Sequence, residues 1–201
     1  MFRFDAATHT YTLGEQVLPS VTQILQPLQD FSMIAPAVLE HARSRGVAVH
    51  KCVQLDINND LDEASVAPEI AGYLKAWRAF RADCRITAAD FGEPERPLFH
   101  PTLRFAGTPD IPLCMDKRWA ILDIKTADAL SPVWALQTAG YRELINVNTM
   151  KSAHLIEDRY SLRLRENRTY KLDQFKDRND WTTFLAMLTA WRWRAANLQG
   201  E

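Results

Sequence analysis

Two spacings of apolar residues run through the chain, and each predicts a class of secondary structure. Apolar residues that recur every three or four positions predict helices. Helices are expected over four segments: residues 34–55, from Pro68 onward, 131–146 and 180–197. In the second segment Ile70, Leu74 and Trp77 form one apolar stripe. Ser131 followed by Pro132 is typical of a helix start.

Apolar residues at alternate positions predict strands. Strands are expected over residues 85–91, 96–100, 104–113, 119–125 and 152–158, with 160–165 as a hairpin partner of the last. Near the N-terminus FRFD and TYTLG flank a polar turn and predict a hairpin, and Ser20 is a candidate N-cap for a short helix. This mixture predicts an α/β fold with a mixed central β-sheet flanked by helices.

The length and composition favour a single domain. The chain has 201 residues, of which 47% are hydrophobic, and this is enough apolar material for one good core. No internal repeat or low-complexity tract divides it. We therefore expect one domain over residues 1–201. It would consist of an N-terminal hairpin and short helix (1–30), a core (33–158) and a C-terminal hairpin and helix (159–201).

Charge and cysteine content exclude several classes of protein. The formal net charge of −1 argues against binding nucleic acid by overall basicity. The three cysteines, Cys52, Cys84 and Cys114, are far apart and form no CxxC pair, so neither a zinc site nor a disulfide framework is expected. The N-terminus has no apolar signal region, and no apolar run is long enough to span a membrane. A cytoplasmic protein with no membrane partner is expected.

An acid and a base lie inside the most apolar strand. Asp123 and Lys125 are two positions apart and therefore share a face, while Ile124 points the opposite way. Asp110 lies one strand earlier, so it can lie beside Asp123 across a hairpin. Buried charges are costly unless they meet partners or a metal ion. A plain Asp–Lys ion pair on a half-exposed strand is one interpretation of this pattern.

A divalent cation is the other interpretation. Two neighbouring carboxylates repel each other, and a cation removes that conflict. Carboxylate oxygens suit Mg²⁺ or Mn²⁺, and a lysine beside the metal can orient an attacking water and offset phosphate charge. Metal-assisted hydrolysis of a phosphodiester would follow from such a site.

Four motifs occur in a fixed order around this pair: GVAVH (46–50), GTPD (107–110), DIK (123–125) and QTAGY (137–141). Their order and spacing resemble those of the PD-(D/E)XK nuclease superfamily, in the branch similar to the RecB nuclease domain. The resemblance covers roughly residues 50–141. It implies a restriction-endonuclease-like core and metal-dependent cleavage of phosphodiesters, in a single-domain form of the phage or prophage type.

The resemblance also implies roles for individual residues. His50, Asp110 and Asp123 match metal ligands, together with the backbone carbonyl of Ile124, and the two aspartates also count among the catalytic residues. Lys125 matches the catalytic lysine. Without the motif, His50 would be interpreted as a structural histidine.

Further residues match the family less directly. Gln137 and Tyr141 match a pair that supports the site and contacts phosphates, and their spacing puts both on one helix face. Glu95 is a looser match to a further acid of the metal site, with Glu93 as its rival. Some relatives hold an iron–sulfur cluster on four cysteines. No such cluster is expected here because no cysteine follows Cys114.

Other aromatic and basic residues have two interpretations. Trp134 is the tryptophan best placed to stack on a base, and core packing is the alternative. The basic run over residues 159–171 includes Arg163 and Arg165. It is either a phosphate-contacting hairpin or a charged, solvated strand edge. Arg142 lies next to a motif residue and is a further candidate for contacting phosphate.

The leading hypothesis is a Mg²⁺- or Mn²⁺-dependent deoxyribonuclease. We expect an exonuclease that acts on DNA in phage-type recombination or processing, together with a recombination partner protein. A non-catalytic DNA-binding or assembly subunit that keeps the fold is the alternative, and RNA is an alternative substrate. The sequence leaves open the strand polarity, the choice between single and double strands, the number of metal ions and the oligomeric state.

Overall fold

A four-stranded mixed sheet forms the centre of the protein in the computed structural model, which describes residues 1–150 and 154–198. Its strands are β6 (Ile111–Met115), β7 (Arg118–Lys125), β8 (Asp158–Leu164) and β9 (Tyr170–Gln174), in that spatial order. The β6–β7 and β8–β9 pairs are antiparallel, whereas β7 and β8 are parallel. The parallel pair needs a crossover, and α4 (Val133–Val147) lies within it.

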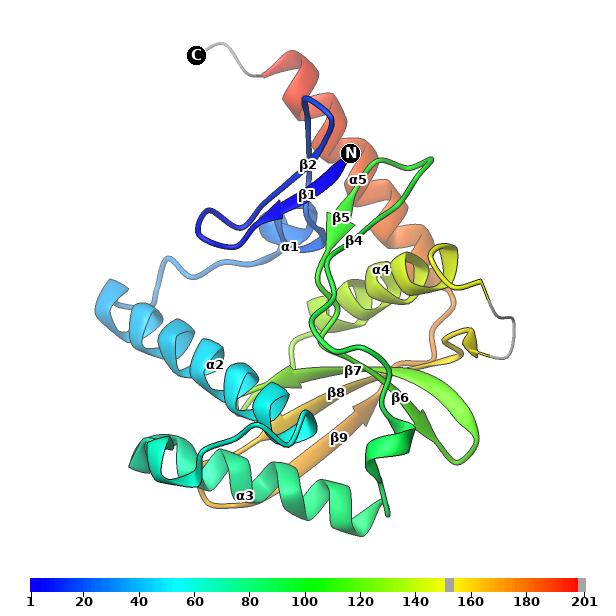
Figure 1. The fold of residues 1–201 in the computed structure, drawn as a ribbon. Coiled ribbons are helices and arrows are strands. Elements are labelled where there is room, and N and C mark those ends of the chain that lie inside the picture. Colours follow the sequence, from blue (N-terminus) through cyan, green and yellow to red (C-terminus); the bar gives the residue numbers. More distant parts are fainter. Residues whose placement is uncertain (151–153, 199–201) are drawn as a thin grey trace.

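Helices cover both faces of this sheet. Figure 1 shows α4 and α5 (Asn179–Asn197) on one side and α3 (Pro68–Asp83) on the other, with α2 (Pro36–Ile57) beside α3. The expected mixed α/β fold is confirmed, and it is consistent with a restriction-endonuclease-like core. Among the described residues no helix is both long enough and apolar enough to cross a membrane.

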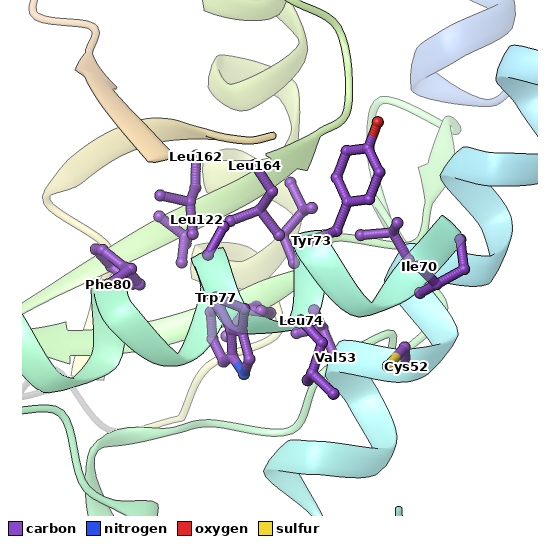
Figure 2. Close-up of a cluster of buried hydrophobic side chains, with 14 of the residues drawn as sticks. Cys52, Val53, Ile70, Tyr73, Leu74, Trp77, Phe80, Leu122, Leu162 and Leu164 are labelled. Atoms are coloured by element: carbon purple, nitrogen blue, oxygen red, sulfur yellow. The ribbon is translucent and has the colours of Figure 1, made fainter. Parts of the chain in front are cut away.

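The larger core lies between the sheet and the pair α2 and α3. The predicted stripe of α3 is confirmed, because Ile70, Leu74 and Trp77 are all buried there. Figure 2 shows them with Leu122 and Leu162 from the sheet. On β7 the alternation then sends the neighbours of Leu122 to the opposite face of the sheet, toward α4.

A small N-terminal sheet packs near the opposite face. It contains β1 (Phe2–Asp5), β2 (Thr10–Leu13) and β3 (Gln16–Leu18), all antiparallel. The expected N-cap is confirmed: Ser20 starts α1 (Val21–Leu25) with a reciprocal capping box to Gln23. The two-stranded ribbon of β4 (Leu98–Phe99) and β5 (Ala106–Gly107) joins this region through a bridge between Ser20 and Ala106. Short 3₁₀ turns also occur at η1 (Gln26–Leu28), η2 (Glu63–Ser65) and η3 (Ala88–Asp90).

The strand predictions on the approach to the sheet were wrong in detail. Residues 85–91 form no strand, because Arg85 has a positive φ of 55° and Thr87 then starts η3 with a capping box to Asp90. The segment 104–113 is not one strand but two, β5 and β6, separated by Thr108–Asp110. That break places Asp110 just before β6.

The strand expected at 152–158 was also misplaced. Residues 151–153 lie outside the described part of the chain, and the strand β8 begins at Asp158. The segment 160–165, expected to be a hairpin partner, is β8 itself, and β9 is its partner. Arg159 and Arg163 on this strand do not mark a solvated edge, because β8 lies between β7 and β9 and both arginines are buried in ion pairs, with Asp180 and Asp173.

Candidate active site

The register of the β6–β7 hairpin brings the two aspartates together. Ile111 pairs with Leu122, so Asp110, one residue before β6, lies opposite Asp123. One Asp110 oxygen accepts the backbone N–H of Ile124 at 2.7 Å. Both carboxylates are buried, with exposed fractions of 6% for Asp110 and 1% for Asp123. The expected juxtaposition across the hairpin is confirmed.

His50 reaches this point from the face of α2. Its Nε2 atom lies 3.0 Å from the carbonyl oxygen of Ile124. Its Nδ1 atom lies 3.3 Å from Glu95 Oε1 and 3.6 Å from Asp110 Oδ1. Both backbone polar groups of Ile124 are therefore held: Asp110 accepts its N–H, and His50 contacts its carbonyl oxygen.

His50, Glu95 and Asp110 form a group that could hold a metal ion. One ligand atom from each lies within 4.8 Å of the other two. The choice between Glu95 and Glu93, which the sequence left open, falls to Glu95 by position. The backbone N–H of Glu95 donates to the carbonyl oxygen of Asp110 at 2.8 Å, which holds Glu95 beside the group. The carboxylate of Glu93 instead lies 3.5 Å from the guanidinium of Arg96. Asp123 lies beside this group but is not a member of it.

Lys125 connects Asp123 to the helix behind it. Its Nζ atom lies 2.7 Å from Asp123 Oδ2 and donates to Gln137 Oε1 at 3.0 Å. Gln137 in turn donates to the Tyr141 hydroxyl at 3.2 Å. The predicted alignment of Gln137 and Tyr141 on one helix face is thus seen, and the row leads directly to the lysine.

Trp134 lies beneath this lysine. The Nζ atom of Lys125 is 5.5 Å from the centre of its ring, within the range of a cation–π contact. The side chain is buried, with 9% of its surface exposed. Trp134 therefore lies where it packs under Lys125, and the core interpretation is the one that the structure favours over base stacking.

The carboxylate of Asp123 has unusual surroundings. Both of its oxygens are buried, and neither accepts a hydrogen bond of regular geometry within residues 1–150 and 154–198. The contact with Lys125 is an ion pair whose angle falls outside that geometry. Buried oxygens without donors are what a cation or ordered water commonly satisfies. The donor set, of carboxylates, an imidazole and a carbonyl, fits a hard divalent metal.

The charges of the site shift several pKa values. Burial raises the pKa of Asp123 to about 6, with Asp110 adding to the shift and Lys125 opposing it. Burial likewise raises the pKa of Asp110, against the pull of His50. Burial alone would lower the pKa of His50, but Asp110 and Glu95 outweigh it and raise the pKa to about 9. At neutral pH the imidazolium thus supplies the positive charge among the carboxylates.

Tyr11 and Thr108 lie near the site, and neither was predicted from the sequence as a site residue. Tyr11 is buried, and its hydroxyl lies 2.8 Å from Thr108 Oγ1, inside the GTPD motif. Burial raises the pKa of Tyr11, and Thr108 partly offsets this. Gly107 of the same motif is needed for packing, because a Cβ there would lie 3.0 Å from the Tyr141 ring. Only the motif itself signalled Thr108, and nothing in the sequence linked Tyr11 to it.

The three candidate phosphate-contacting arginines are not gathered at one place. Arg163 is buried, and its guanidinium pairs with Asp173 at 2.7 Å and contacts the carbonyl of Asp128. It has no free face for phosphate. Arg165 lies beyond the end of β8, partly exposed, 3.8 Å from Asp128. Arg142 lines a separate cavity with residues from the starts of β7 and β8.

Comparison with known proteins concerns the fold. No protein-family model and no curated protein sequence matches the chain. A solved structure from Eubacterium rectale, described as "Putative exonuclease", aligns with a TM-score of 0.52 at 12% identity, over 78% of this chain and 69% of that chain. LHK-Exo in complex with dAMP aligns over 90% of this chain and 94% of that chain at 13% identity. Its TM-score of 0.32 is too low to support a shared fold. The protein thus shares the fold of the first of these structures.

Proposed function

We propose that the protein is a metal-dependent deoxyribonuclease. One observation carries the proposal: ligand atoms of His50, Glu95 and Asp110 lie within 4.8 Å of one another. Asp110 of this group lies opposite Asp123, which pairs with Lys125, and the second ring nitrogen of His50 contacts the Ile124 carbonyl. The motif order supports it, as does the fold shared with a protein described as an exonuclease. A plain structural ion pair would need neither the histidine nor the additional carboxylates.

His50, Glu95, Asp110 and the Ile124 carbonyl would hold a divalent ion, with Asp123 beside them. Their oxygen-rich set favours Mg²⁺ or Mn²⁺. When bound, such an ion supplies Lewis-acid stabilisation of charge on a phosphate oxygen and a more acidic water. Binding at neutral pH displaces the proton of His50, because the pKa of that residue is raised to about 9.

The residues of the chain then have distinct tasks. Lys125, held between Asp123 and Gln137, orients the attacking water and offsets the charge that develops on phosphate. Gln137 fixes the position of the ammonium group and is itself fixed by Tyr141. Asp123 lies 2.7 Å from the Lys125 ammonium group and helps to position it. Arg165, the partly exposed arginine past β8, is placed to meet a neighbouring phosphate.

We extend the proposal to attack from DNA ends. Tight binding to long duplexes requires many phosphate contacts, but the 24 lysines and arginines are balanced by 25 acidic residues, so the protein has no overall attraction for DNA. A short groove that holds one strand end needs only a few phosphate contacts. On the motif resemblance, we further propose a role in phage-type recombination or DNA processing, together with a recombination partner protein.

The test is incubation with end-labelled linear DNA and with closed circular DNA, in Mg²⁺, Mn²⁺, Ca²⁺ or EDTA. We expect cleavage of linear DNA with Mg²⁺ or Mn²⁺ and none with EDTA or Ca²⁺. Closed circles should survive. Nicking of circles at the linear rate would refute attack from ends alone. Binding of DNA without any cleavage, in all three metals, would instead support a non-catalytic DNA-binding subunit.

A further inference from the structure

A cavity lined by several basic side chains lies at the end of the sheet away from the proposed active site. It measures about 350 Å³ and is lined by five basic side chains: Arg118, Arg142, Arg159, Lys176 and Arg178. They come from the start of β7, from α4, from the start of β8 and from the turn between β9 and α5. Lys125 is at the other end of β7 from Arg118, a distance of roughly 20 Å along an extended strand.

Some of these cations already have partners. Arg118 pairs with Asp158 at 2.8 Å and with Glu157 at 3.2 Å. Arg159 is 3% exposed, and it pairs with Asp180 at 2.7 Å while donating to the carbonyl oxygens of Ala135 and Asp177. These bonds fix one wall of the cavity.

The remaining three cations, Arg142, Lys176 and Arg178, have no carboxylate within 4.0 Å in the part of the chain that the structure describes. The third acid of the lining, Asp177, accepts the N–H of Asn179 at 2.9 Å and so caps the start of α5. The cavity therefore has an excess of positive charge, and the positive end of the 19-residue helix α5 adds to it.

Arg142 is held there against an electrostatic cost. It is half-buried, and burial together with the like charge of Arg159 lowers the pKa of its guanidinium. A cation in this position gains free energy when an anion enters, because the anion offsets both the lost hydration and the repulsion. The planar guanidinium presents paired donors that match two oxygens of a phosphate group.

We propose that this cavity is a phosphate-binding site, separate from the proposed active site. Arg142 is its central ligand, and Lys176 and Arg178 complete it from the exposed rim. Two sources share this chemistry: a free phosphate or mononucleotide, and the backbone of a DNA strand. A strand that occupied both sites would span several nucleotides.

The test is a titration of the metal-free protein with inorganic phosphate in EDTA, followed by calorimetry at constant ionic strength made up with chloride. We expect saturable binding to the wild type and about tenfold weaker binding to Arg142→Gln, which loses charge-assisted hydrogen bonds. Lys176→Gln, on the exposed rim, should also weaken binding without affecting folding. Arg142→Lys should bind with intermediate affinity, because it keeps the charge but loses the planar fork.

Lys75→Gln is the control, because it removes a positive charge on the exposed face of α3 and does not line the cavity. It should bind phosphate as the wild type does. Absence of saturable binding to the wild type, or equal losses in Lys75→Gln and Arg142→Gln, would overturn the proposal. Competition then identifies the source. Displacement of phosphate by an oligonucleotide without terminal phosphates indicates a backbone site, and displacement by a mononucleotide alone indicates a site for free phosphates. Either result upholds the cavity as a phosphate site.

Discussion

Asp123 carries a carboxylate where burial opposes its charge. The residue is 1% exposed and has only the ammonium group of Lys125 as a close ionic partner among the described residues. Its folded pKa of about 6 is above the ordinary value of 3.8, so the free energy of unfolding falls as pH rises from about 3.8 to about 6 and stays reduced above that. Such a cost is typical of side chains kept for chemistry instead of stability.

Asp123→Asn should therefore stabilise the metal-free protein while abolishing cleavage. At about pH 7.5 the gain in the free energy of unfolding should be on the order of 2 kcal/mol, since each pKa unit is worth about 1.4 kcal/mol. Asparagine keeps the shape of the buried side chain and removes the charge whose burial is costly. Chemical denaturation in EDTA, paired with a DNA cleavage assay, measures both effects. A variant that is less stable than the wild type at this pH, yet active, would contradict the assignment.

Lys125→Met should reduce turnover by about 10²- to 10⁴-fold, because the ammonium group that orients the water is lost. Methionine keeps the packing of the stem over Trp134. The increase in melting temperature on adding Mn²⁺ should persist, since Lys125 is not a metal ligand. Lys75→Ala, on the exposed face of α3, is the control for lost charge and should leave turnover unchanged. Near wild-type turnover in Lys125→Met would show that the lysine has another role.

Sequence reasoning found most of the residues that meet at the site, but not all. The motifs supplied His50, Asp110 and Lys125, because fixed spacing along helices and strands determines which face a residue occupies. Tyr11 was missed because it comes from a sheet 97 residues away along the chain from Thr108. Pairing between distant segments depends on tertiary packing, which no local pattern encodes. Arg163 was misassigned for the same reason, since its partner Asp173 lies on the next strand.

At the scale of elements, the turn between β4 and β5 depends on a neutral histidine. His100 Nδ1 accepts the backbone N–H groups of Leu103 at 3.0 Å and Thr102 at 3.2 Å. A protonated ring would place a hydrogen where these donors point. Burial lowers the pKa of His100, and Glu143 only partly offsets this. The β4–β5 ribbon leads through Gly107 to Asp110, so this turn supports the approach to the site.

The contribution of His100 to the stability of the protein should therefore fall in mild acid. With its folded pKa below the unfolded value of 6.5, His100 contributes stability that is present above pH 6.5 and is lost as pH falls through the lowered pKa. The raised pKa values of Asp123 and His50 act in the opposite sense, so the effect of His100 is measured as a difference between proteins. Urea denaturation between about pH 5 and 7 compares the wild type with His100→Asn, which keeps a short acceptor. The difference in their free energies of unfolding should shrink as pH falls, by at most about 1.4 kcal/mol per pH unit; a difference that is constant with pH would exclude this role.

Elements with regular apolar spacing were predicted well, and elements defined by backbone irregularity were not. Helices α3 and α5 were located to within a residue or so at their starts, because one apolar face is enough to define them. The segment 85–91 alternates like a strand, but a positive φ at Arg85 and the capping box of η3 override that pattern. The bounds of β8 were also predicted wrongly, because this strand is central yet contains arginines, Arg159 and Arg163, which are buried only through their ion pairs.

At the scale of the whole molecule, charge limits how DNA is held. The net charge is −1, and the five basic side chains of the cavity lie at the end of β7 opposite to Lys125. Each phosphate contact adds about 0.9 to the magnitude of the slope of log affinity against log salt. We expect a slope no steeper than about −3, measured as KM for linear duplex DNA between about 50 and 200 mM salt. A slope near −10 would indicate an extended interface that these residues do not form.

The parallel pairing of β7 with β8 also affects how the chain folds during its synthesis. Lys125 and Arg163 are cross-strand neighbours, yet their positions in the chain differ by 38. A ribosome-bound chain that ends before β8 leaves β7 without this partner and α4 without its contacts to β8 and α5. Long-range parallel pairing is intrinsically slow to form. The central sheet is therefore completed only after its last two strands have left the ribosome.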